Sequence, residues 1–298
     1  MTVLIFDPIY SDLELPPGHR FPIRKYQMLR DRLGEEGIPQ AAIWRPAPLP
    51  PELVKGPLCS EYVDRFVAGT LEPAAVRKIG FPWSERLVRR TFTSVAGTIL
   101  AGRMALEHGR AINLAGGYHH AFHDTGSGFC IINDLYLSAL DLLRQPGVGR
   151  VLVFDCDVHQ GDGTAKLAQR HPDIITVSIH GEKNFPFHKQ VSDLDVNLSG
   201  GVGDDQYLQC VNDTLTTAIA RFKPDVVIYD AGADIHCDDE LGHFDISLGG
   251  VYQRDNLVFQ QCTAAGLPVS AVIGGGYQRD LDALVNVHLQ LFRAALLI

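Results

Sequence analysis

Short apolar segments alternate with longer amphipathic segments along most of the chain. The apolar runs are rich in Val and Ile and end near Gly or Asp, which is typical of strands that are buried on both faces of a sheet. They predict strands at Val3–Phe6, Ala111–Leu114, Val151–Phe154, Ile174–Ile179, Val226–Tyr229 and Val269–Ile273.

The segments between these runs have helical periodicity. In Glu85–His108, the apolar residues Val88, Phe92, Val95 and Ile99 recur at steps of four, three and four, which predicts one long helix. Four further helices are predicted at Asp134–Arg144, Asp205–Arg221, Gly250–Ala265 and Arg279–Leu297. The alternation predicts an α/β fold with a central, mostly parallel sheet flanked by helices on both faces. In such folds ligands bind beyond the carboxyl ends of the strands.

The length of 298 residues suits one large domain or two small ones. The Pro-rich segment Arg45–Pro51 is interpreted as a surface loop, because the sheet pattern continues beyond it without a change in composition. We therefore expect residues 1–298 to form a single domain.

The balance of charges limits the classes of ligand. The chain has 26 Lys and Arg against 35 Asp and Glu, a formal net charge of −9, which disfavours nucleic acid as a partner. The same balance mildly favours a cationic substrate, although a solvated acidic surface is the simpler interpretation. No segment reaches the ~18 apolar residues of a membrane span, and Met1–Pro8 lacks the cationic start of a signal peptide, so no membrane partner is expected. Six scattered cysteines favour free thiols in the reducing cytoplasm.

The strongest candidate chemistry follows the third predicted strand. Asp155, Asp157 and His159 stand at positions i, i+2 and i+4, so in an extended chain their side chains share one face. Two carboxylates and an imidazole at the end of a strand suit a divalent metal. The alternative is an Asp/His cluster that caps the next helix, but charges that emerge directly from an apolar strand are costly unless paired.

Adjacent histidines follow the second predicted strand. His119 and His120 could act as general base and acid if a carboxylate fixes the tautomer of each ring, and Asp155 and Asp162 are available. A His-His pair alone is weak evidence, and its place after a strand strengthens it.

Two further strands end in polar or glycine-rich turns. Asp234 follows one of them, where a lone Asp is ordinarily a helix cap. Tyr277 follows the glycines 274–276, which allow the backbone to approach a ligand closely, and its phenol can donate a hydrogen bond to a developing oxyanion. A phosphate-binding loop is disfavoured because neither GxGxxG nor GK[ST] is present.

Together these stretches resemble the histone deacetylase and acetylpolyamine amidohydrolase superfamily from about His19 to Phe292. The resemblance is carried by GGYHHA (116–121), GFCIIND (128–134), DCDVHQGDG (155–163), AGAD (231–234) and GGGY (274–277). It is closest to class IV deacetylases and their bacterial relatives, through His19–Pro22 opening the first helix, Gly203–Tyr207 and Leu248–Asn256. The resemblance implies the arginase/deacetylase fold. Arginase itself is disfavoured, because its two-metal pattern is Asp-x-His-x-Asp and this chain has Asp-x-His-x-x-Asp.

The resemblance also implies two kinds of metal site. Asp157, His159 and Asp234 would bind one catalytic zinc ion, or ferrous iron. A structural potassium ion would be held by Asp155, the backbone of Asp157 and His159, Ser178 and Ile179.

For catalysis, the resemblance implies that His119 and His120 are backed by Asp155 and Asp162, and that Tyr277 stabilises the oxyanion. The channel for the acylated side chain would be lined by Phe129, Phe185 and Gly275. Arg24 is a candidate for the arginine of the inner channel, and His180 and His243 are candidates for the rim of the pocket. Class I deacetylases carry an Asp ahead of the long helix, whereas Gly80–Trp83 has no acidic residue.

The function that follows is hydrolysis of the acyl amide of N-acyl-lysine, or of a related acylated amine, by a zinc-dependent deacetylase. Two alternatives concern the substrate: acetylpolyamines or other small acylated amines, and a longer fatty-acyl chain. An alternative of another class is a catalytically inactive acyl-lysine binder. The oligomeric state is not predicted by the sequence.

Overall fold

A single parallel sheet forms the centre of the molecule. The computed structural model describes residues 2–38 and 43–296, in which eight strands pair in the order β2-β1-β3-β8-β7-β4-β5-β6, every pair parallel. The strands are β1 (Thr2–Ile5), β2 (Ile43–Trp44), β3 (Arg110–Asn113), β4 (Val151–Asp155), β5 (Ile174–Gly181), β6 (Leu194–Leu198), β7 (Val226–Asp230) and β8 (Val269–Val272). The predicted parallel α/β architecture is confirmed.

The two strands that the sequence pattern missed lie at the edges of the sheet. β2 has two residues, one of them exposed, and β6 alternates Asp195 and Asn197 with apolar residues. An edge strand is not covered on both faces, so it lacks the continuous apolar run by which the inner strands were found.

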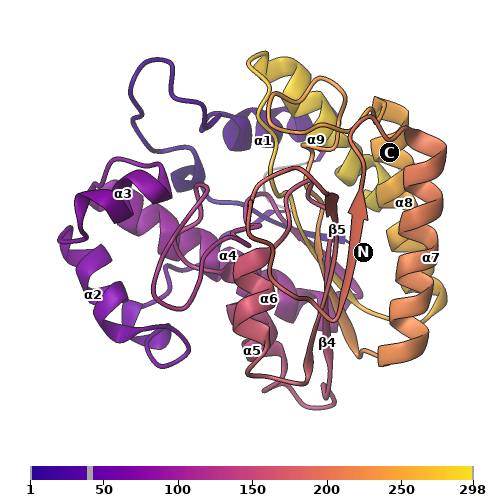
Figure 1. Cartoon of the computed structure of the whole chain (residues 1–298), viewed down its shortest axis with the longest axis horizontal. Coiled ribbons are helices and arrows are strands. Elements are labelled where there is room, and N and C mark those ends of the chain that lie inside the picture. Colours follow the sequence, from indigo (N-terminus) through magenta and orange to yellow (C-terminus); the bar gives the residue numbers. More distant parts are fainter. Residues whose placement is uncertain (1, 39–42, 297–298) are drawn as a thin grey trace.

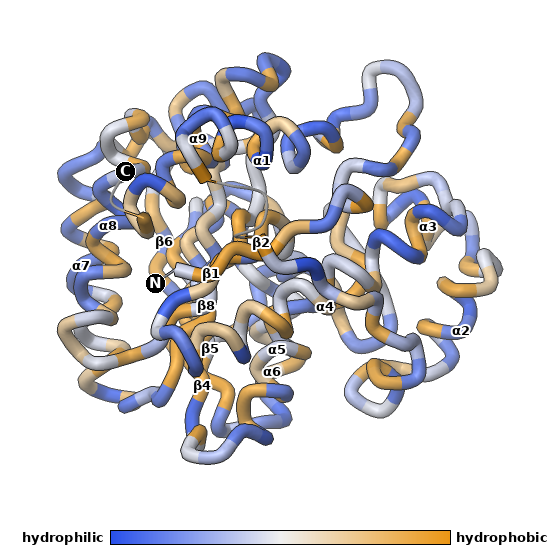
Figure 2. The backbone as a smooth tube through the Cα atoms, turned by 180° about the vertical axis from the view of Figure 1, so that it is seen from behind, coloured by the Kyte–Doolittle hydropathy of each residue, from blue (hydrophilic) through white to orange (hydrophobic). Residues whose placement is uncertain are grey.

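Helices cover both faces of the sheet (Figure 1). They are α1 (Lys25–Glu35), α2 (Ser60–Ala68), α3 (Pro73–Ile79), α4 (Glu85–His108), α5 (Asp134–Leu142), α6 (Asp162–Ala168), α7 (Asp204–Phe222), α8 (Leu248–Ala264) and α9 (Leu281–Leu296). One layer consists of α7, α8, α9 and α1, and the other of α4, α5 and α6, with α2 and α3 beyond α4 (Figure 1). Figure 2 shows the apolar strands enclosed by these helices.

Helix boundaries follow local capping. The predicted helix Glu85–His108 is α4, which begins where the Ser84 hydroxyl accepts a hydrogen bond from the backbone N–H of Leu87 at 3.1 Å. The first helix begins at Lys25 rather than at His19–Pro22, since the prolines at 16, 17 and 22 disfavour a regular helix there. Leu297, the predicted last residue of the final helix, lies outside the described residues.

The Pro-rich segment has the irregular backbone that was predicted for a loop. Residues 45–50 have neither helix nor strand, and a short 3-10 turn, Pro51–Leu53, follows them. Among the described residues, no helix is both long and apolar enough to cross a membrane.

The register of the sheet positions the polar residues. Asp155 at the end of β4 lies between Ser178 of β5 and Asp230 of β7, so the three residues stand in one row at the carboxyl edge. Side chains in one row across a parallel sheet point to the same face, which places two carboxylates side by side.

Candidate active site

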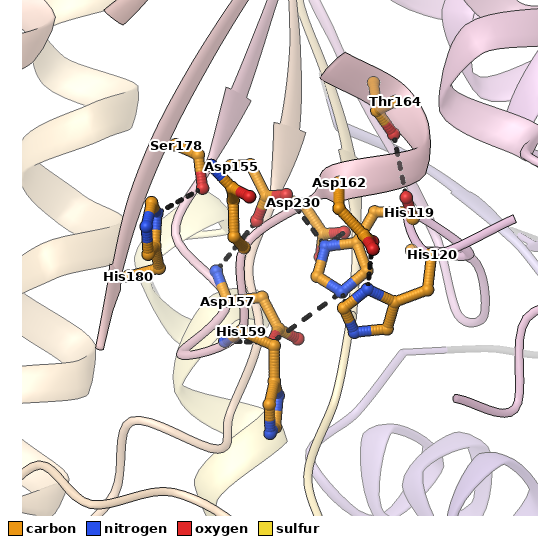
Figure 3. Close-up of polar contacts among 12 residues, drawn as sticks. His119, His120, Asp155, Asp157, His159, Asp162, Thr164, Ser178, His180 and Asp230 are labelled. Carbon is orange, nitrogen blue, oxygen red and sulfur yellow. Dashed lines mark hydrogen bonds and ion pairs between the residues drawn. The ribbon is translucent and has the colours of Figure 1, made fainter. Parts of the chain in front are cut away.

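Three residues from two loops converge at the carboxyl edge of the sheet. His159 Nδ1 lies 2.9 Å from Asp157 Oδ1 and 3.1 Å from Asp234 Oδ2, and all three side chains are buried. Asp157 and His159 are labelled in Figure 3. Backbone groups orient the carboxylates, because Gly275 N–H donates to Asp157 Oδ2 at 2.8 Å and Val158 N–H donates to Asp234 Oδ1 at 3.0 Å. Asp157 and His159 lie in the bends that follow β4 and form one group with Asp234, whereas Asp155, predicted on the same face, belongs to a separate group with His119.

The chemistry of this group fits a divalent cation. One ligand atom from each of Asp157, His159 and Asp234 lies within 4.8 Å of the other two. Burial and the Asp157 carboxylate raise the pKa of Asp234 to about 7. Burial lowers the pKa of His159, but the two carboxylates outweigh it and raise that pKa to about 10. Two buried carboxylates around one imidazole nitrogen thus attract positive charge, as a metal site with N and O ligands requires.

The adjacent histidines form a proton-sharing pair. His119 Nε2 lies 3.1 Å from His120 Nε2, and each ring has its own carboxylate on the opposite nitrogen (Figure 3). His119 Nδ1 lies 2.8 Å from Asp155 Oδ2, and His120 Nδ1 lies 2.7 Å from Asp162 Oδ1. The expected pairing of each histidine with a carboxylate is present in this geometry.

The two histidines have different electrostatic surroundings. Burial disfavours the cation in both rings, but Asp155 and Asp157 outweigh it at His119 and raise the pKa of that ring well above its usual range. At His120, burial together with the His119 charge lowers the pKa to about 4. These opposite shifts favour the cation at His119 and the neutral ring at His120.

A cavity of about 750 Å³ leads to these groups, and its lining includes His120, His159, Phe129, Phe185 and Tyr277. The Phe185 ring stands edge-on to His120 at 4.8 Å between centroids, and the Phe129 ring is 5.8 Å from that of Tyr277. The backbone N–H of Tyr277 donates to Asp239 Oδ2 at 2.7 Å, which fixes the end of the glycine turn.

Two of the remaining predicted residues lie elsewhere than expected. Gly275 is buried behind the cavity, where a Cβ would collide with the carboxylates of Asp157 and Asp234, so it supports the ligands instead of lining the channel. His243 lines the cavity, whereas His180 is fully buried and its Nδ1 lies 2.9 Å from Ser178 Oγ. The physical reason is strand register: His180 belongs to β5, two residues beyond Ser178 on the same covered face. Ile179, also on β5, is buried beside it.

Asp230 directly precedes the AGAD motif and is not among the predicted site residues. It is fully buried, its Oδ2 lies 3.9 Å from His119 Nδ1, and neither of its carboxylate oxygens has a hydrogen-bond partner among the described residues. Figure 3 shows it beside Asp155 and His119. The signal was available, because Asp230 ends an apolar strand in the same way as Asp155 does.

Lys25, and not the candidate Arg24, reaches the glycine turn that precedes Tyr277. Arg24 is exposed, whereas the Lys25 ammonium is buried and donates to the carbonyl oxygens of Gly274 at 3.3 Å and Gly276 at 3.5 Å. Burial lowers the pKa of Lys25 to about 8 against the opposing effect of Asp234. Helical spacing explains the difference, because Lys25 lies four residues before the buried Leu29 and so faces the core.

Comparisons with known proteins identify the family of the chain. A model of the histone deacetylase domain matches residues 19–292. An uncharacterized protein of Picosynechococcus is 46% identical, covering 98% of this chain and 97% of its own. Histone deacetylase 2 of Arabidopsis thaliana is 34% identical over 66% of this chain and 53% of its own, and the acetoin utilization protein AcuC of Bacillus subtilis is 33% identical over 61% and 51%. The matched region thus spans about half the length of these two named relatives.

Solved structures share the architecture at low identity. The HD domain of HDA15 superposes with a TM-score of 0.82 at 20% identity, covering 99% of this chain and 88% of that domain. An HDAC homologue complexed with SAHA gives 0.82 at 22%, covering 98% and 83%. This likeness shows the arginase/deacetylase fold, and with the match to the domain model it establishes that the chain belongs to the histone deacetylase family.

Proposed function

We propose that residues 1–298 form one catalytic domain of a metal-dependent deacetylase, which hydrolyses the acyl amide of N-acyl-lysine to a carboxylate and a free amine. The observation that carries the proposal is the convergence of Asp157, His159 and Asp234 with the His119–His120 pair beside one cavity. Membership of the histone deacetylase family and the named deacetylase relatives support it. The six free thiols suit the cytoplasm.

Asp157, His159 and Asp234 would hold the metal, which we propose to be zinc, with ferrous iron as the alternative. When bound there, the ion would polarise the acyl carbonyl and lower the pKa of a water molecule. The potassium ion would be held by a second set of groups: Asp155, the backbone of Asp157 and His159, Ser178 and Ile179. The register of β4 and β5, which pairs the buried Asp155 and Ser178, supports this second site.

The histidine pair moves the proton. His120 is neutral and oriented by Asp162, so its Nε2 would exchange the contact with His119 Nε2 for the attacking water and accept its proton as the water oxygen bonds to the acyl carbon. His119, oriented by Asp155, keeps its positive charge beside the developing negative charge. When the carbon–nitrogen bond breaks, the proton held by His120 passes to the leaving amine nitrogen.

The Tyr277 phenol donates to the carbonyl oxygen as it becomes an oxyanion. Burial and Asp157 raise the pKa of Tyr277 well above its usual range, so the phenol keeps its proton at neutral pH. Phe129 and Phe185 form the apolar walls along the acylated side chain, because both rings line the cavity close to the catalytic groups.

The test is a turnover assay on the purified protein. We expect acetate release from an Nε-acetyl-lysine peptide to stop after treatment with dipicolinate and to return with one equivalent of Zn²⁺ or Fe²⁺ per chain. Myristoyl-lysine peptide and acetylputrescine serve as further substrates. A metal-loaded, folded protein that turns over none of the three would overturn the proposal, and binding of acetyl-lysine without turnover would favour the inactive binder.

A further inference from the structure

The exposed charged side chains that line the cavity are of one sign. Lys78 and Lys183 line the cavity, and both are exposed. Among the described residues, the acidic side chain in that lining is Asp162, which is buried and bonded to His120. The neighbouring Glu182 is exposed but does not belong to the lining. This distribution is the reverse of that of the whole chain, which carries a net charge of −9.

Lys78 is fixed to the wall that carries Phe129. It lies in the last turn of α3, and its carbonyl oxygen accepts a hydrogen bond from Gly128 N–H at 3.2 Å. The next carbonyl, that of Ile79, accepts from Phe129 N–H at 2.8 Å. The position of the lysine backbone is therefore coupled to the position of the channel ring.

Lys183 belongs to the segment that carries Phe185. The adjacent Asn184 is buried, and its side-chain amide donates to the carbonyl oxygen of Leu241 at 2.8 Å, which fastens this loop to the far side of the cavity. Phe185, two residues further, stands against His120. The segment that carries Phe129 and the segment that carries Phe185 thus each include one exposed lysine that lines the cavity.

A second hollow of about 460 Å³ shares Tyr277 with the cavity, and its lining also includes exposed basic side chains. Arg20 and Arg24 line it, and both are exposed. Its acidic residue, Glu240, is neutralised by Arg279, whose Nε lies 2.7 Å from Glu240 Oε1. The surface on both sides of Tyr277 is therefore basic, and it attracts anions over a distance of roughly 10 Å at moderate salt.

We propose that the deacetylase selects acyl-lysines flanked by acidic residues: the basic rim of Lys78, Lys183, Arg20 and Arg24 recognises carboxylates beside the acyl amide. This inference rests on the proposed function and names its substrate class. It disfavours substrates that bring further ammonium groups, such as acetylpolyamines, and it reverses the mild preference for a cationic substrate that the net charge alone suggests.

The experiment compares three peptides with one central acetyl-lysine and Glu, Ser or Lys at the two positions on each side, together with acetylputrescine. We expect kcat/KM to fall in the order Glu, Ser, Lys, with about 5- to 20-fold between the first and last at low salt. The ratio should shrink to about twofold or less in 0.5 M NaCl, because solvent screens exposed charges. Turnover with equal kcat/KM for all three peptides would overturn the inference alone, whereas absence of turnover on every substrate would count against the proposed function.

Charge reversal locates the effect. In the double variant Lys78→Glu/Lys183→Glu, we expect the order of the Glu and Lys peptides to invert. Arg144→Glu is the matched control, because Arg144 is exposed after α5, at the edge of the sheet where β4 begins, and lines neither hollow. It should keep the wild-type order. A double variant that folds and keeps the preference for the acidic peptide would contradict the role of the two lysines.

Discussion

Two buried charged clusters lie on opposite faces of β7, and they differ in charge balance. Successive residues of a strand point to opposite faces, so Tyr229 points to one cluster and Asp230 to the other. On the α8 side, Arg254 Nε donates to Asp255 Oδ1 at 2.9 Å, and the Tyr229 hydroxyl donates to the same oxygen at 2.6 Å. Arg254 also donates to the carbonyl oxygens of Gly232 at 2.6 Å and Ala231 at 3.2 Å. The positive charge of Arg254 is balanced by the negative charge of Asp255, so this cluster carries no net charge.

The other cluster has an excess of negative charge. It gathers the carboxylates of Asp155, Asp157, Asp230 and Asp234 around His119 and His159. Asp230 has no hydrogen-bond partner among the described residues. A balanced buried cluster needs no further ion, whereas an unbalanced one favours a bound cation or proton and so indicates a candidate site. The two clusters are connected, since Arg254 holds the backbone of the turn that leads to Asp234.

The largest expected effect comes from Asp234→Asn. Removing one of the two carboxylates should abolish metal retention and lower kcat/KM by more than about 10³-fold, as measured by metal content and acetate release. The metal-free variant should nevertheless be more stable than metal-free wild type. The pKa of Asp234 is about 7 in the folded protein, against about 3.9 unfolded, so the stability gained from its bound proton is lost as pH rises from about 4 to about 7.

Denaturant titrations at pH 4.5 and pH 8 provide the check. The gap in unfolding free energy between the metal-free variant and metal-free wild type should widen with pH, by about 1–4 kcal/mol. A variant that loses stability to the same extent at both pH values would show that the carboxylate excess is not a source of instability, and the contrast between the clusters would fail.

In the balanced cluster, Arg254→Met should cost about 3–5 kcal/mol, because Asp255 would be left as a buried unpaired charge. The double variant Arg254→Met/Asp255→Leu should recover most of that loss. The matched control is Arg103→Met, which breaks an exposed pair with Asp141 and should cost less than about 1 kcal/mol. If the single Arg254 variant costs no more than the control, the buried pair is not a structural support.

The variant Tyr277→Phe tests the chemical step at the negatively charged cluster without changing the candidate metal ligands. It removes only the oxyanion donor, so kcat should fall by about 10²- to 10³-fold while metal content and melting temperature stay at wild-type values. The control is Tyr252→Phe on α8, a tyrosine that does not line the cavity. Full activity in Tyr277→Phe would remove the phenol from the mechanism.

The inner sheet and the metal-ligand candidates were predictable because each leaves a local pattern. Buried strands are continuous apolar runs, and Asp157 and His159 alternate directly after one of them. Asp230 was missed although it ends an apolar strand as Asp155 does, whereas Lys25 and the Arg254–Asp255 pair were missed because their roles depend on neighbours distant in sequence. Lys25 is defined by Gly274 and Gly276, some 250 residues away, and only the packing of α1 shows that it, not Arg24, faces the site. Burial of a single charge is a property of the fold, not of the local sequence.

The smallest expected effect is that of Tyr229→Phe, and it tests whether the two faces of β7 are separable. The variant removes one hydrogen bond to Asp255, whose Oδ1 still accepts from Arg254, so the expected cost is about 1–2 kcal/mol in a urea titration. Since Arg254 continues to hold the Gly232 carbonyl, the turn before Asp234 should stay in place, and kcat/KM and metal content should match wild type. A loss of metal in this variant would mean that the position of the metal ligands depends on the complete hydrogen-bond network of the balanced cluster. The residues of that cluster would then belong to the functional site as well as to the structural support.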